Sequence, residues 1–169
     1  MSPGWPSLSV PTSKTRTQTQ PPRPLAKETY VPATLSLSSD TRTTAGILLL
    51  TILAVEFGGL TMLRIVRGHQ PATGFQKSFA RAGHAHAGVF VIFALIALIL
   101  ADAAHLHGAA NVLARNGIWV AAILFPAGFF GSSAGGGATR PNRLIVLVYL
   151  GAAALTAGVL TLGIGLLSS

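Results

Sequence analysis

Three titratable residues lie inside strongly apolar stretches of the 169-residue chain, where a charged or hydrogen-bonding group is costly unless it has a partner. Glu56 interrupts one apolar run, and His84 and His86 open the next. A carboxyl group and imidazoles inside a membrane can relay protons or coordinate a cation, and they can also join two helices by a hydrogen bond. We take Glu56, His84 and His86 as a candidate proton or cation site, with a purely structural hydrogen bond as the alternative for Glu56.

The spacing of the two histidines limits how they could ligate a metal ion or haem. Residues two apart point about 200° apart on a helix, so His84 and His86 cannot easily ligate one metal from the same helical face. A bound metal or haem would therefore need a further ligand, such as His69 or Glu56. A histidine satisfied by water or lipid headgroups is the competing interpretation. The cofactor is thus unknown: none is expected, and haem or a metal ion stays as an alternative.

A second His-x-His sequence, His105 to His107, follows about 21 residues later. If the intervening residues are helical, this pair lies more than about 30 Å from the first pair. The two pairs cannot form one site. We expect His105, His107 and the nearby Asp102 to lie in a solvated loop.

Arginines border the apolar runs without a matching number of acids: Arg64, Arg67, Arg81, Arg140 and Arg143. One interpretation is an anchor at the membrane surface. The other is a cationic rim beneath Glu56 and the histidines that attracts an anion or a lipid phosphate. A nucleic-acid partner is not indicated, because the basic residues are not interleaved with stacking aromatic residues on a folded domain.

Four apolar segments must position these residues. Only 9% of the chain is charged, against about 25% in a typical soluble protein. The segments are residues 44–63, 83–101, 117–133 and 144–167. They are apolar on every face, which excludes the alternating pattern of membrane β-strands and leaves helices as the spanning structure. The third segment is the shortest, near the lower limit of about 17 residues for a membrane span.

The short connections between these segments predict an all-α, up-down-up-down bundle in the cell membrane. The first and third connections are rich in arginine and lysine and contain no acid. The positive-inside rule then places both connections in the cytoplasm and both termini outside.

Residues 1–42 differ in kind from the membrane domain at 43–169. Seven of the ten prolines fall within residues 1–40, with no sustained apolar run. Such a segment cannot bury enough surface to offset its ordering entropy, so we predict a disordered tail.

Small residues recur on one face of each of the last two segments. In residues 144–167 they are Gly151, Ala154, Gly158, Thr161 and Gly165. In residues 117–133 they are Gly117, Ala121, Gly128 and Gly131. Small residues let helices approach closely in lipid. We expect these two faces to meet within the chain, although one of them could instead join two protomers. Pro126 predicts a kink in the third helix.

Four stretches resemble a family of small bacterial integral membrane proteins whose activity is uncharacterised. They are residues 55–59 (VEFGG), 81–88 (RAGHAHAG), 126–130 (PAGFF) and 139–152 (TRPNRLIVLVYLGA). The resemblance covers about residues 43–167 and implies a four-helix membrane protein without assigning an activity.

Three functions follow from these features. The first is association, as an accessory subunit or homo-oligomer that uses the glycine faces within the lipid bilayer or a larger membrane complex. The second is a proton- or cation-coupled carrier or channel using Glu56 with His84 and His86. The third is a haem- or metal-binding redox component. The chain lacks a nucleophile–base pattern and a phosphate-binding loop, which argues against an enzyme acting on a soluble substrate.

Overall fold

The computed structural model describes residues 36–168, together with Met1 and Gly4. Most of the predicted tail at residues 1–42 therefore lies outside the described residues. Its last part is described, and there the chain is already helical from Ser39.

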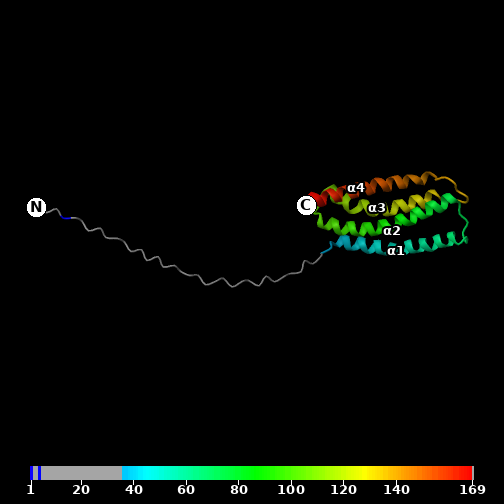
Figure 1. Cartoon of the computed structure of the whole chain (residues 1–169), viewed down its shortest axis with the longest axis horizontal. Helices are drawn as coiled ribbons and strands as arrows, with labels where there is room; N and C mark the ends of the chain where they lie inside the picture. The colour runs from blue at the N-terminus through cyan, green and yellow to red at the C-terminus, as the bar shows by residue number, and fades with distance from the viewer. Residues whose placement is uncertain (2–3, 5–35, 169) are drawn as a thin grey trace. The chain divides into compact units, whose positions relative to one another are not determined.

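Four long helices make up the described part of the chain, which contains no β-strand. They are α1 (Ser39–Val66), α2 (Gly74–Ala103), α3 (Gly108–Ser132) and α4 (Val146–Ser168), the last preceded by a 3₁₀ turn, η1 (Arg143–Ile145). Successive helices run antiparallel, so that α1 begins and α4 ends at the same end of the bundle (Figure 1). Each is long and apolar enough to cross a membrane. The predicted all-α, four-helix architecture of a multi-pass membrane protein is thus confirmed.

The predicted starts of the second and third helices are wrong. They begin at Gly74 and Gly108, nine residues before the predicted starts at 83 and 117. Hydropathy misses the polar first turns, whereas a capping box formed by Thr73 and Gln76 starts α2. The third helix is consequently 25 residues long and continues through Pro126. These earlier starts also place residues expected in connections, such as Arg81, inside helices.

Packing within the bundle is uneven. The helix α3 packs against both α4 and α2, whereas α1 packs mainly against α2. In the most apolar window of each helix, 39% of the residues of α3 are buried but only 6% of those of α1. Leu48 of α1 lies in the buried core among residues of α2 and α3 such as Val91 and Ile118, and Ile65 is the other buried apolar residue of α1. The first helix therefore lies at the margin of the bundle, as Figure 1 shows.

The small-residue faces of α3 and α4 meet, as the sequence predicts. A Cβ atom added to Gly117 would lie 2.6 Å from the carbonyl oxygen of Ala154 and 2.8 Å from Cα of Gly158. One added to Gly128 would lie 2.6 Å from the Val148 side chain. Helix backbones can approach this closely only where side chains are absent. These glycines therefore serve the contact between α3 and α4 within one chain.

Candidate functional site

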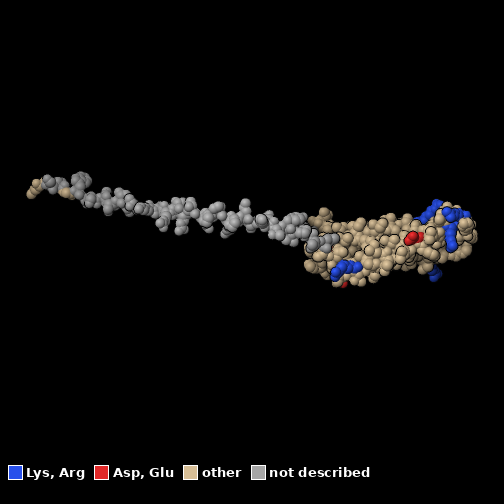
Figure 2. Space-filling model, turned by 90° about the horizontal axis from the view of Figure 1, so that it is seen from below, with Lys and Arg blue, Asp and Glu red and all other residues tan. Residues whose placement is uncertain are grey.

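Glu56 lies on the outward side of α1, within its apolar stretch and eight residues before Arg64. Its side chain is exposed, and no hydrogen bond or ion pair joins it to any residue in 36–168. Figure 2 shows the charged groups of this face toward the two ends of the bundle, with a tan band between them and an acidic patch at the edge of that band next to the basic end. An acid in this band faces the hydrocarbon unless another molecule covers it.

His84 points from α2 toward α1, where two glycines leave room for its ring. A Cβ atom at Gly58 would lie 3.4 Å from its Nδ1, and one at Gly59 would lie 3.3 Å from its Cε1. The imidazole is half-buried, and its nitrogens have no hydrogen-bond partner within the described chain. Its nitrogens keep accessible surface, so a hydrogen-bonding group from outside the chain can reach them.

The contact expected between Glu56 and a histidine is not formed in residues 36–168. Neither a salt bridge nor a hydrogen bond connects the carboxylate to His84 or His86. The glycine side of α1 receives His84, whereas Glu56 is exposed to the outside. The proton or cation hypothesis stays a prediction, without the carboxylate–imidazole contact on which the sequence argument depended.

His86 points to the other side of α2, into a cluster of phenylalanines. Its ring is stacked on Phe125 with centroids 5.1 Å apart and lies edge-on to Phe90 at 5.3 Å. A third ring, Phe129, is 5.2 Å away. The Nδ1 atom lies 2.7 Å from the carbonyl oxygen of Ala82, one turn earlier. Nδ1 therefore donates the hydrogen bond, and His86 serves as part of the packing between α2 and α3.

A lateral groove with a volume of about 400 Å³ lies between α1, α2 and α3. Most of its lining is apolar, and His84 is the titratable residue in it. The lining residues are Thr44, Ile47, Leu48, Thr51, Ala54, Val55, Gly58, His84, Ala87, Val91, Trp119, Ala122, Ile123, Pro126 and Phe130. The size is within the range of small-molecule sites, about 300–1,000 Å³. This groove combines such a volume with an unpaired imidazole that is half-buried.

A metal centre is not preassembled in residues 36–168. No three His, Asp or Glu side chains lie close enough there to hold a metal ion. His69 lies instead in a separate hollow at the end of α1 that also includes Arg64 and Arg67. The haem or metal hypothesis therefore lacks a formed ligand set and stays a prediction.

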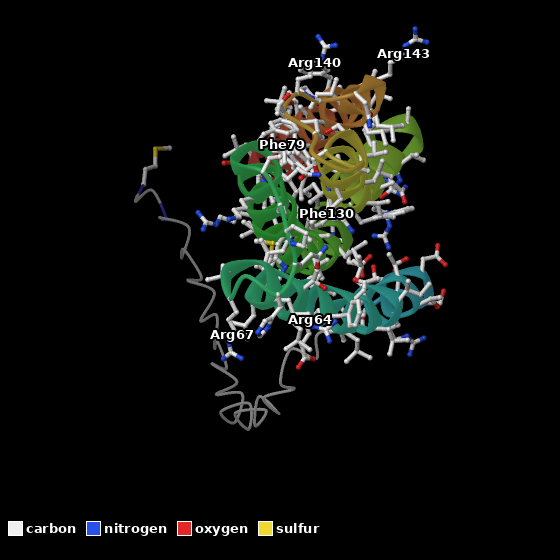
Figure 3. The ribbon with its side chains drawn as sticks, turned by 90° about the vertical axis from the view of Figure 1, so that its right-hand side faces the viewer. Arg64, Arg67, Phe79, Phe130, Arg140 and Arg143 are labelled. Atoms are coloured by element: carbon white, nitrogen blue, oxygen red, sulfur yellow. The ribbon has the colours of Figure 1, made fainter. Side chains whose placement is uncertain are left out.

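The predicted basic rim is divided into two groups. Figure 3 shows Arg64 and Arg67 of α1 on one side of the bundle end, and Arg140 and Arg143 on the opposite side. Arg140 and Arg143 border a separate hollow around the start of α4. The arginines can each anchor the protein at a membrane surface, but their separation does not favour a single cationic rim below the histidines.

A polar network that the sequence analysis missed ties three helices together at the other end. Arg115 of α3 forms an ion pair with Asp102 of α2, with Nη1 2.6 Å from Oδ1. Its Nη2 donates to the hydroxyls of Ser38 and Thr41, at 2.7 and 2.8 Å. The backbone N–H of Ser38 donates to the same carboxylate. The sequence does contain a signal for this pair, because Asp102 and Arg115 lie at the two ends of one short connection. The hydropathy pattern places both residues in a loop and so does not reveal the pairing.

The second histidine pair lies where the sequence predicts. His105 and His107 are in the connection between α2 and α3, and both are exposed. Asp102 is the exception, because it belongs to the last turn of α2 and is paired with Arg115.

Glutamine and threonine side chains fix the connection before α4 onto the start of α2. Gln76 Nε2 donates to the carbonyl oxygens of Ser133 and Gly135, at 3.0 and 2.7 Å. The hydroxyl of Thr73 donates to the carbonyl oxygen of Ala138 at 2.5 Å. These bonds hold α2, α3 and α4 as a unit and do not involve α1.

Comparison of the chain with protein-family models, with curated proteins and with solved structures finds no match. The function must therefore be argued from the geometry of the helices.

Proposed function

We propose that this small membrane protein acts by association, as a homo-oligomer whose contact is the outer face of α1. The observation that carries the proposal is Glu56, exposed within a hydrophobic span and unpaired in the described chain. An acid at such depth costs about 2.5–3.5 kcal/mol on insertion scales. A second protein surface that offers hydrogen bonds reduces this cost.

Four leucines flank Glu56 at alternating spacings of four and three residues: Leu49, Leu53, Leu60 and Leu63. Together with Glu56 they form the Glu56 stripe. The four leucines are 43–65% exposed. This spacing is the heptad pattern of helices that pack in pairs, and a polar residue at one central position fixes register and oligomeric state. The stripe thus has the pattern of a helix–helix contact surface, and Glu56 is the polar residue that would fix its register.

A second copy of the chain is the partner that fits this stripe. Copies inserted with the same orientation place Glu56 at the same depth, so a two-fold axis along the membrane normal brings the two carboxyl groups together. One carboxyl group can then donate a hydrogen bond that the other accepts, with a proton shared between them. A different partner would need a cation or a donor at that depth.

The proposal moves the association surface away from the glycine faces that the sequence suggested. Gly151 and Gly158 of α4 are buried against α3, and Gly165 lies against Leu106. A glycine that already receives a neighbouring helix is not free for a second copy. Among the exposed apolar faces that remain, that of α1 carries the unpaired Glu56.

The test measures self-association of the purified protein by energy transfer between labelled copies in liposomes. Glu56→Leu should weaken association by about 1–2 kcal/mol, because it removes the interhelical hydrogen bond. Glu56→Gln should retain most of it, since an amide both donates and accepts. A wild-type protein that stays monomeric as the protein-to-lipid ratio rises, or a Glu56→Leu variant that associates like the wild type, contradicts the proposal.

A matched pair of leucines provides the control. Leu60 in the stripe and Leu160 on α4 are 57% and 58% exposed. Leu60→Ala should reduce association while Leu160→Ala leaves it unchanged. Equal effects of the two changes would indicate contact without a preferred face.

A further inference from the structure

The lateral groove lies where α1 packs on α2 and makes few contacts with α3. Ala87 of α2 and Ala122 of α3 form part of its floor, and Gly58 of α1 closes one end beside His84. Along α1 the lining extends from Thr44 to Gly58, about 20 Å at the helical rise. The groove is thus long, narrow and apolar, with its imidazole at one end.

The position of His84 restricts the polar group that can pair with it. Gly58, against which the ring packs, precedes Arg64 by six residues, so it lies about 9 Å inside the basic end of α1. The groove lining contains no lysine or arginine in the described chain. A phosphate or carboxylate head would lose hydration there without gaining a cation. A neutral head group does not bear that cost.

The aromatic side chains at the groove favour a flat head group. Phe130 lines it beside His84, and Figure 3 shows Phe130 between α2 and α1. A planar ring can pack against this phenylalanine while a substituent reaches the imidazole. Neutral histidine has one N–H donor and one acceptor nitrogen, so either a carbonyl or a hydroxyl group can pair with it.

We infer that the groove binds a neutral amphiphile with a hydrocarbon tail and one small ring head that carries a carbonyl or hydroxyl group. His84 forms the hydrogen bond to the head, and the tail lies along α1 toward Thr44. A bound isoprenoid quinone or phenol has this chemistry. The site is independent of the Glu56 stripe, because His84 and Glu56 lie on different sides of α1.

Trp119 lines the groove and reports on its occupant. The chain has two tryptophans, so a Trp5→Phe background leaves Trp119 as the fluorophore. A short-chain ubiquinone, which quenches tryptophan, is titrated into the purified full-length protein in detergent. Quenching should saturate at one quinone per chain. Quenching that rises linearly without saturation, as expected for collisions in the micelle, overturns the inference.

Variants separate recognition of the head from burial of the tail. His84→Leu should raise the Kd for the quinone about 5- to 10-fold, the value of one hydrogen bond. His84→Gln should restore most of the affinity, and His107→Leu, in the exposed connection, should change nothing. Dodecane should bind equally to the wild type and to His84→Leu. If His84→Leu binds the quinone like the wild type, the groove takes only hydrocarbon chains, and the inference fails.

A steric variant tests the place of binding. Ala54 lines the groove from α1, and Ala153 is an exposed alanine on α4. Ala54→Phe should remove saturable quenching, whereas Ala153→Phe should retain it. Helicity by circular dichroism and an unchanged elution volume verify that each variant is folded, so that a lost signal reports on the groove. Retained quenching in Ala54→Phe places the quinone elsewhere and contradicts the inference.

Discussion

The α3–α4 pair and helix α1 belong to one bundle but are held in different ways. Between α3 and α4, glycines such as Gly117 and Gly158 bring the backbones into direct contact. The first helix has larger residues on much of its surface, packs mainly on α2 and leaves the lateral groove beside α3. The difference follows from side-chain size, since lipid offers no hydrophobic driving force and helices associate by close packing and hydrogen bonds.

The difference in packing indicates where a small membrane bundle can bind a ligand or a partner. A tightly packed pair has little surface or volume left for a ligand. A loosely packed helix offers an exposed outer face on one side and a groove on the other. Glu56 lies on the outer face and His84 beside the groove, so these two unpaired groups are both associated with α1.

The largest expected effect on stability comes from separating α3 from α4. In Gly117→Val, the new Cβ atom meets the Ala154 carbonyl oxygen, so α3 and α4 must separate. The free energy of unfolding should fall by about 2–3 kcal/mol. Gly163→Val is the control, because a Cβ there meets nothing within 4 Å. Thermal unfolding in detergent measures both, and similar midpoints would show that close approach does not hold this pair.

An intermediate loss of stability is expected from disrupting the polar network that joins the start of α1 to α2 and α3. Arg115→Leu removes the ion pair with Asp102 and two hydrogen bonds to the start of α1, with both charged side chains about 15% exposed. Stability should fall by about 2 kcal/mol. Amide exchange should accelerate first in the opening turns of α1.

Two further variants test whether the loss comes from the unpaired carboxylate. The double variant Asp102→Leu with Arg115→Leu should recover part of the stability, because no buried charge then lacks a partner. Arg143→Leu, an exposed arginine, should have little effect. Uniform exchange across all helices in Arg115→Leu would argue against a local anchor.

The smallest effect distinguishes two histidines that are two positions apart. His86→Ala removes a stacked ring between α2 and α3 and a hydrogen bond within α2, and it should cost about 1 kcal/mol. His84→Ala, beside the groove, should change stability by less than about 0.5 kcal/mol. Denaturant titration of both variants measures the difference. Equal losses would mean that the groove side is packed as closely as the phenylalanine cluster.

Much of the fold could be predicted because the membrane limits the alternatives. Long apolar runs require helices, and short connections require antiparallel neighbours. The predicted start of α2 is too late because Thr73 and Gln76 act by capping, to which hydropathy is insensitive. The site was harder to predict. The depth of Glu56 and His84 follows from residue number, but their directions depend on how α1 is rotated against α2.

The helices, their order and the small-residue surface that joins α3 to α4 follow from the amino-acid sequence, since they depend on local composition and on spacing along a helix. The packing of the bundle places His86 among phenylalanines and His84 beside a groove, and it leaves Glu56 facing outward. Rotation of one helix against another is set by contacts between residues far apart in the chain, and hydropathy carries no information about these contacts.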